Sequence, residues 1–201
     1  NELMSVTLSN VTVPGNTRPS TGTVEFQLKT GNGSSLEYLS TSLSFRNTEA
    51  GRIDPATAGV QPNYWEKGKL ANYTFRFVPV NFEQNMKIVI GLDRRVTIPD
   101  NWNRTCRGIR GTDKSELACE VDWYNYTITL TDAVATKDVK PDVIEFVLEG
   151  LANPIYNVVT DSFTILTRTW DWYDIDFIDT GLTLNFYCVF PCATCNLDVP
   201  D

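Results

Sequence analysis

The sequence predicts an all-β protein, an immunoglobulin-like or jelly-roll β-sandwich. Apolar and polar residues alternate over short segments, as strands with one buried face require. No stretch of a dozen residues keeps apolar positions at the spacing of an amphipathic helix. Clusters of Gly, Pro, Asn and Asp separate the alternating segments, and 42% of the 201 residues are hydrophobic, which is enough to form a core.

Each predicted strand is a short segment between turns. The strands are predicted at 24–28, 73–77, 87–91, 126–130, 143–148, 163–166 and 182–186. A long alternation at 3–13 also predicts a strand, either the first strand of the chain's own sandwich or one donated to a neighbouring subunit. The segment 133–139 fits a short helical turn.

The strand 24–30 resembles a later segment, 162–167, and each is followed by an aromatic strand and an apolar alternation that ends in Phe. The two copies are about 137 to 141 positions apart. The repeat predicts a partial module or strand-contributing segment at 1–50, a complete module at 51–187 and a cysteine-containing tail at 188–201. The other interpretation is one large sandwich whose strands look alike because all strands share a pattern.

Two of the five cysteines bracket a polar stretch with two glycines. Cys106 and Cys119 therefore predict a hairpin-like loop closed by a disulfide, which stabilises the fold by about 3 kcal/mol. Cys188, Cys192 and Cys195 are a poor zinc site, because zinc wants four ligands and the chain has no histidine. Their odd number leaves open a partner in a cysteine-rich continuation, a bond to a neighbouring subunit, or free thiols.

The sequence also contains five N-x-[ST] motifs, each an acceptor site for N-linked glycans. They are centred on Asn10, Asn32, Asn72, Asn103 and Asn125. Together with the cysteines, these motifs predict an extracellular or cell-surface protein, because disulfides form in oxidising compartments.

Composition excludes several classes of function. The formal net charge is −8 and there is no run rich in Lys and Arg, so nucleic acid is not expected as a partner. No apolar run approaches the roughly 20 residues of a transmembrane helix, so membrane insertion is not expected either. The absence of histidine removes the Ser-His-Asp and Cys-His catalytic centres, and no nucleophile or glycosidase signature takes their place. The sequence therefore predicts a protein that is not an enzyme and that needs no cofactor.

The most unusual segment is the acidic and aromatic run at 170–179. One interpretation is an edge strand whose charges prevent aggregation. A second is a calcium site, because clustered carboxylates such as Asp174, Asp176 and Asp179 suit Ca²⁺, although their spacing is not that of an EF-hand loop. A third is a glycan-stacking surface formed by the aromatic side chains Trp170, Trp172 and Tyr173.

The order of features from 72 to 195 resembles a known kind of module. The alternation 73–77, the Cys106/Cys119 insertion, the segment Asn153-Pro154 followed by Phe163-x-Ile-x-Thr167, and the run 192–195 come in sequence. This order is similar to the tandem β-sandwich modules of large, cysteine-rich surface and filament proteins of protists, such as mastigoneme (flagellar hair) proteins. The resemblance implies a structural role in an extracellular glycoprotein assembly, with no catalytic residues to carry over.

From these observations we expect a structural subunit of an extracellular filament or cell-surface coat. It would assemble with copies of itself or with adjacent modules, through strand edges and intermodule contacts, and carry N-linked glycans. The alternative is an adhesin-like module that binds carbohydrate or a surface receptor through its loops or the aromatic run.

Overall fold

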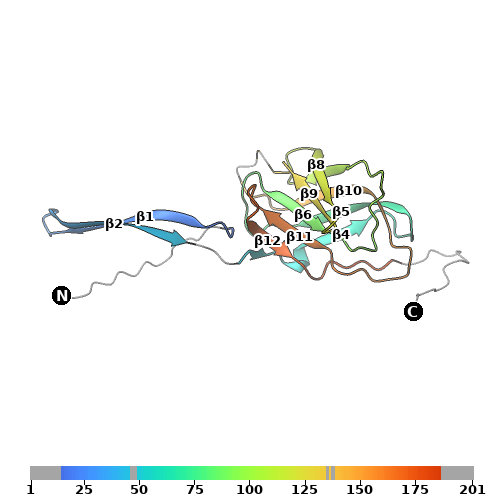
Figure 1. The fold of residues 1–201 in the computed structure, drawn as a ribbon, viewed down its shortest axis with the longest axis horizontal. Helices are drawn as coiled ribbons and strands as arrows, with labels where there is room; N and C mark the ends of the chain where they lie inside the picture. The colour runs from blue at the N-terminus through green and yellow to red at the C-terminus, as the bar shows by residue number, and fades with distance from the viewer. Residues whose placement is uncertain (1–14, 46–48, 135, 137–138, 187–201) are drawn as a thin grey trace, which may run out of the picture.

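The computed structural model of the chain describes residues 15–45, 49–134, 136 and 139–186. These residues form a β-sandwich and a long hairpin that projects from it (Figure 1). The only helical element among them is a single 3₁₀ turn, η1 (Pro55–Thr57). The predicted all-β sandwich is thus confirmed.

The hairpin consists of β1 (Ser20–Lys29) and β2 (Ser35–Phe45). The strands pair antiparallel from Ser20 opposite Phe45 to Lys29 opposite Ser35, with one register shift at the end next to the turn. The turn closes with two backbone hydrogen bonds between Thr30 and its neighbours, and Gly33 takes a φ of 84°, a left-handed conformation that glycine adopts without strain.

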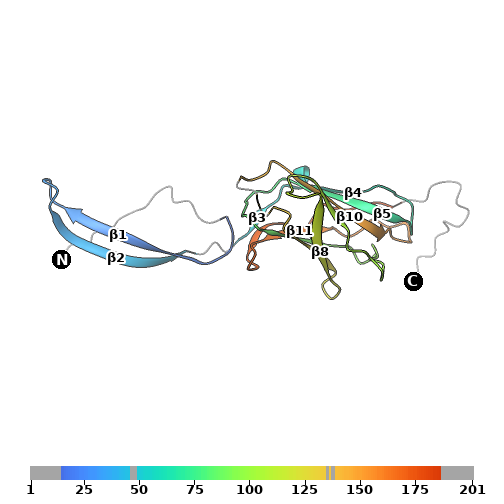
Figure 2. The same cartoon turned by 90° about the horizontal axis from the view of Figure 1, so that it is seen from above.

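The sandwich has two layers, which Figure 2 shows from above. One layer has the strand order β3-β12-β11-β6-β9-β8 and the other has the order β7-β10-β5-β4. Pairing of β7 with β8 joins the two layers into one curled sheet. The strands are β3 (Gly51–Arg52), β4 (Gly59–Pro62), β5 (Leu70–Phe77), β6 (Lys87–Gly91), β7 (Cys106–Arg110), β8 (Glu116–Asp122), β9 (Thr127–Thr131), β10 (Ile144–Ala152), β11 (Thr164–Arg168) and β12 (Asp174–Ile178).

Aromatic side chains from both layers fill the core. The rings of Phe75 and Phe146 stack at a centroid distance of 5.6 Å within one layer. Phe163, which immediately precedes β11 in the other layer, packs edge-on against Phe75 at 5.9 Å. All three rings are fully buried, and Phe75 lies on the inward face of the alternation along β5. Such ring pairs add to the stabilisation from burial.

The buried Asn153 explains the Asn-Pro motif found in the sequence. Its Oδ1 accepts a hydrogen bond from the Tyr73 hydroxyl at 2.6 Å, and its Nδ2 donates to the carbonyl oxygens of Tyr64 and Glu66, each at 2.8 Å. A buried amide with its hydrogen bonds satisfied fixes the loop between β4 and β5 against the end of β10. Burial raises the pKa of Tyr73 well above its ordinary value, so the hydroxyl stays a donor.

The predicted disulfide is confirmed. Cys106 in β7 and Cys119 in β8 are bonded, with their Cα atoms 6.2 Å apart. The bond lies where the two layers meet, because β7 also pairs with β10 and β8 also pairs with β9.

Two local predictions were wrong. The segment 182–186 is not a regular strand, but it runs antiparallel to 158–163 through hydrogen bonds such as that from the Phe163 amide to the Leu182 carbonyl, at 2.9 Å. The run 170–179 is not one strand, because 170–173 form the turn between β11 and β12. The described residues of 133–139 form turns and a bend, and the short helical turn stays a prediction because 135, 137 and 138 lie outside the described residues. The predicted strand at 3–13 lies outside the described residues.

Candidate interaction site

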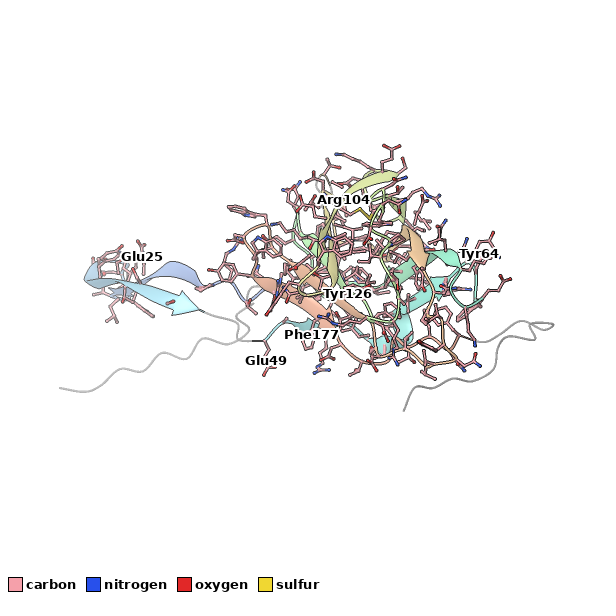
Figure 3. All side chains as sticks on the ribbon, turned by 45° about the vertical axis from the view of Figure 1, so that its right-hand side comes forward. Glu25, Glu49, Tyr64, Arg104, Tyr126 and Phe177 are labelled. Atoms are coloured by element: carbon pink, nitrogen blue, oxygen red, sulfur yellow. A yellow bond between two sulfur atoms is a disulfide. The ribbon has the colours of Figure 1, made fainter. Side chains whose placement is uncertain are left out.

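The hairpin forms a two-stranded sheet by itself. Within the described part of the chain, neither β1 nor β2 pairs with a third strand. Figure 3 shows Glu25 of the hairpin well apart from the side chains of the sandwich. A lone two-stranded hairpin is marginally stable in water, and its outer edges present unpaired backbone groups. Among the described elements, the hairpin is therefore the one best suited to contact another protein surface.

The pairing register gives the hairpin two different faces. Positions 20, 22, 24, 26 and 28 lie opposite 45, 43, 41, 39 and 37, so these ten positions share one face. The apolar residues at these positions are Val24, Phe26, Leu28, Leu39, Leu43 and Phe45, and the remaining four are Ser20, Gly22, Glu37 and Thr41. The other face holds Thr, Ser, Glu, Gln, Lys and Tyr, with Leu36 at the register shift. Phe26 is only half-buried and Leu28 is 38% exposed. At these two positions the hairpin is less buried than the inward-facing positions of the sandwich strands.

The segment before β1 anchors the hairpin on the sandwich. Thr17 forms two hydrogen bonds with the start of β12: its amide donates to the Asp174 carbonyl at 2.9 Å, and its hydroxyl accepts from the Asp174 amide at 3.0 Å. Asn16 donates from Nδ2 to Glu83 at 2.7 Å. These bonds hold the base of β1 against the sandwich.

Arg18 completes this anchor electrostatically. Its guanidinium lies between Glu83, at 3.2 Å, and Asp171, and its Cζ is 5.9 Å from the centre of the Tyr173 ring. The hydrogen bond to Asp171 raises the pKa of Arg18 above its ordinary value. Hydrogen bonds from Thr169 and then from Arg18 lower the pKa of Asp171, so both groups stay charged at neutral pH.

A buried carboxylate fixes the point where the chain enters the sandwich after the hairpin. Asp176 accepts hydrogen bonds from the backbone amides of Val80 and Asn81 and from the Asn81 side chain, at 2.8 to 3.1 Å. Burial raises the pKa of Asp176 above its ordinary value, although these hydrogen bonds oppose the shift. Gly51 of β3 pairs directly with Asp176, and a Cβ atom there would lie 2.2 Å from the carboxylate. Glycine is therefore required at this position.

The predicted calcium cluster does not form. Asp174 pairs with Arg168 at 2.7 Å, Asp179 lies 3.9 Å from Arg52, and Asp176 binds the 80–81 backbone. Among the residues described, no three acidic or cysteine side chains come together in a group that could hold a metal ion. The three carboxylates do not gather because each has its own partner. These partners are Arg168 in β11 for Asp174, Arg52 in β3 for Asp179 and the loop backbone at 80–81 for Asp176.

The aromatic run is also not an edge strand. β12 pairs antiparallel with β11 on one side and in parallel with β3 on the other. Its charged residues therefore do not lie on an edge strand. Trp170 and Trp172 are 63% and 52% exposed. The Lys87 ammonium lies 3.8 Å from the Trp172 ring centre, and Arg168 lies 5.7 Å from it. The ring of Trp172 thus already has cationic partners within the chain.

The glycosylation motifs fall at different kinds of position. Asn32 lies in the turn at the tip of the hairpin and is exposed, as are Asn103 and Asn125. Asn72 lies within β5, is half-buried, and accepts a hydrogen bond from the Gly150 amide at 3.1 Å. Asn10 and the cysteines at 188, 192 and 195 lie outside the described residues.

Sequence reasoning did not find the residues of the anchor. Arg18 and Gly51 carry no local signal, because the partners that give them their roles, Glu83, Asp171 and Asp176, are distant in the sequence. A positive side chain beside Pro19 is compatible with many exposed loops.

Comparison with known proteins does not assign the chain to a family. No family model matches the chain, and no curated protein matches it. Similar solved structures include an uncharacterized protein from Nocardia farcinica with an immunoglobulin-like fold, 20% identical, covering 64% of this chain and 96% of that one with a TM-score of 0.36. They also include a type II cohesin–X-dockerin complex from Acetivibrio cellulolyticus, 8% identical, covering 63% and 92% with a TM-score of 0.34. Among the described residues, no helix is long and apolar enough to cross a membrane. The chain is, on its own strands and pairings, an all-β sandwich that carries a projecting hairpin.

Proposed function

We propose that this chain is a non-catalytic structural module of an extracellular filament or cell-surface coat. The observation that supports this proposal is an amphipathic β-hairpin held away from a complete sandwich. A neighbouring module would cover the apolar face of the hairpin and pair with its free strand edges. Such pairing combines backbone hydrogen bonds with buried apolar area, as in other cases of strand addition.

The anchor supports an architectural role. Arg18 and Thr17 connect the base of the hairpin to Glu83, Asp171 and Asp174 of the sandwich. These contacts give the hairpin a preferred direction, which a regular assembly needs and a flexible tether lacks.

An extracellular location is part of the same proposal. The Cys106–Cys119 disulfide is of the kind that persists in oxidising compartments. Asn32, Asn103 and Asn125 are exposed, so glycans could be added there without displacing the core.

Negative-stain electron microscopy of the natively isolated material, without crosslinker or added ligand, tests the assembly. We expect regular fibrils or a lattice. Dispersed single particles would argue against an assembly role and would favour the alternative below.

The alternative is an adhesin-like module, and the exposed Trp170 and Trp172 favour it. They lie at the turn between β11 and β12, and Trp172 borders an outer face lined by Thr127, Thr129 and Arg168. A binding module of this kind is expected as a monomer whose melting temperature rises when a carbohydrate ligand is added. A screen of the dispersed protein against immobilised glycans, with Trp170→Ala and Trp172→Ala as variants, would identify such a ligand.

A further inference from the structure

The last described part of the sandwich is also a long hairpin, and its antiparallel pairing extends beyond β11 and β12. Ile165 lies opposite Ile178 within the two strands. Beyond them, the Thr160 amide donates to the Leu184 carbonyl at 2.8 Å, and the Phe186 amide donates to the Val158 carbonyl at 3.3 Å. Residues 158–168 and 174–186 thus run antiparallel along their whole length. We name this segment the closing hairpin.

The rest of the sandwich covers the closing hairpin. β11 pairs with β6 along its length. The Phe163 ring packs against Tyr73 at 6.2 Å and against Phe75 at 5.9 Å, and the Phe186 ring lies 5.9 Å from Trp65. The residues of the closing hairpin that face this core are almost wholly buried: Thr160, Phe163, Ile165, Thr167, Ile178, Leu182, Leu184 and Phe186.

The projecting hairpin has the same pattern of residues. Phe26-x-Leu28-x-Thr30 corresponds to Phe163-x-Ile165-x-Thr167, about 137 positions later. Leu43-x-Phe45 corresponds to Leu184-x-Phe186, about 141 positions later. Both are antiparallel hairpins that end in the same Leu-x-Phe. The matched positions are those that the closing hairpin buries, whereas Leu28 is 38% exposed.

The correspondence extends upstream in the sequence. Val6, Leu8, Val11 and Pro14 have the spacing of Phe146, Leu148, Leu151 and Pro154, about 140 positions later. That spacing includes the step from 148 to 151, where the register of β10 shifts. Phe146, Leu148 and Leu151 are buried core residues. The repeat therefore covers a strand and a hairpin, which a chance likeness between two strands does not explain.

From this match we infer that β1–β2 is the closing hairpin of a second sandwich of the same kind, which sequence preceding it in the same polypeptide supplies. This inference rests on the proposed function and names the partner of the hairpin: the counterparts of β3 to β9 in that second sandwich. They would cover the apolar face of the hairpin as β6 and the core aromatic rings cover 158–186.

The spacing of the repeat favours the same polypeptide over a second copy. The sandwich from Gly51 to Phe186 is about 136 residues long, close to the repeat distance of about 137 to 141. In a second copy of this chain the corresponding place is already filled by its own residues 158–186. A foreign hairpin would have to displace that buried segment.

In this arrangement residues 16–18, which anchor the hairpin, would form the junction between successive modules. Asn16, Thr17 and Arg18 precede the hairpin of one module and bind Glu83, Asp171 and Asp174 of the next. Modules in tandem would therefore be held in a preferred relative orientation.

Hydrogen exchange measured by mass spectrometry on two proteins tests the inference. The first consists of residues 1–201. The second is the same chain with residues 51–140 of its own sequence joined in front of Asn1, which supplies the missing strands in the register of the repeat. We expect the β1–β2 amides to exchange at least 100-fold more slowly in the extended protein, while β11–β12 amides stay protected in both.

A matched pair of variants of the extended protein separates docking from a general effect of the extension. Phe26→Ser with Leu28→Ser, on the apolar face, is expected to abolish the new protection. Glu25→Ser with Gln27→Ser, on the polar face of the same strand, is expected to keep it.

Three outcomes would overturn the inference. The hairpin could be as protected as β11–β12 in the monomeric 201-residue chain, which would mean that it needs no partner. Its protection could rise with concentration as the chain dimerises, which would make a second copy the partner. It could stay unprotected in the extended protein, which would show that these strands do not receive it. None of these outcomes depends on filament formation, so microscopy of the native material tests the proposed function separately.

Discussion

At the scale of single residues, Gly51 shows how closely the chain is fitted where it enters the sandwich. Gly51→Ala would place a methyl group 2.2 Å from the Asp176 carboxylate and 2.5 Å from the Asn81 amide. Because Asp176 is held by three donors, it cannot move aside without losing hydrogen bonds. We expect the variant to lose about 1–3 kcal/mol of unfolding free energy in urea denaturation.

Gly59→Ala is the matched control for this prediction. Gly59 also lies in a strand of the sandwich, but a Cβ atom there would meet no heavy atom within 4 Å. The control is expected to stay within about 0.5 kcal/mol of the wild type. Equal losses at both positions would show that the Asp176 contact is not the cause.

The lowered pKa of the buried Asp93 carboxylate predicts that the protein loses stability in acid. Burial alone raises the pKa of Asp93, but the Arg95 side chain, donating at 2.6 to 3.1 Å, and the amides of Arg95 and Asp161 outweigh it and lower the pKa. The stability from this ionised group is present above the unfolded pKa of about 3.9 and is lost as pH falls through the lower folded pKa. Asp93→Asn is expected to lose about 1–3 kcal/mol at pH 7 and to show a shallower decline below about pH 4.

The pKa of Asp176 is shifted in the opposite direction to that of Asp93, so Asp176 provides a contrast in the same pH titration. Its folded pKa is raised by burial, so the native state binds the proton more tightly than the unfolded chain does. Its contribution is present below the unfolded pKa and decreases as pH rises through the folded pKa. Asp176→Asn should consequently steepen the decline of stability in acid. An identical pH profile for the two variants would contradict both assignments.

At the scale of elements, the β7–β8 pair depends on its disulfide. The two strands are directly opposed only at Cys106–Leu117 and Arg107–Glu116 within the named ladder, so few backbone bonds hold the place where the layers meet. The bond closes a loop with a sequence separation of 13. Cys106→Ser with Cys119→Ser is expected to lower the unfolding free energy by about 3 kcal/mol, measured in guanidinium chloride. An unchanged midpoint would show that the strand contacts alone hold the layers together.

At the scale of the whole molecule, the direction of the hairpin depends on Arg18. Its side chain is about one-third exposed, so its ion pairs contribute little to global stability. We expect Arg18→Ala to change the melting temperature little but to broaden the distribution of distances between spin labels placed at Gln27 and Thr57. High salt should broaden the wild-type distribution in the same way.

Lys29→Ala is the matched control, because Lys29 is an exposed cation at the far end of β1. It should leave the distance distribution unchanged. A distribution that stays narrow in Arg18→Ala would mean that Thr17 and Asn16 orient the hairpin without the charge.

The sequence by itself determined the fold class, the central strands and the disulfide. Strand alternation is local, so the segments around Tyr73, Lys87 and Ile144 are readable wherever they pack. Cys106 and Cys119 are close in the chain, with turn residues between them, so their pairing needs no knowledge of distant elements.

Only the tertiary structure decided where the acidic residues of 170–179 go and which part of the chain stands apart. Asp174, Asp176 and Asp179 follow one another in sequence, yet they pair with Arg168, with the 80–81 backbone and with Arg52. The exposure of the hairpin likewise depends on which strands occupy its neighbouring positions, not on its own alternation. A local pattern specifies that a face is apolar, but the partner that covers the face lies far away in the sequence, and only the folded arrangement shows it.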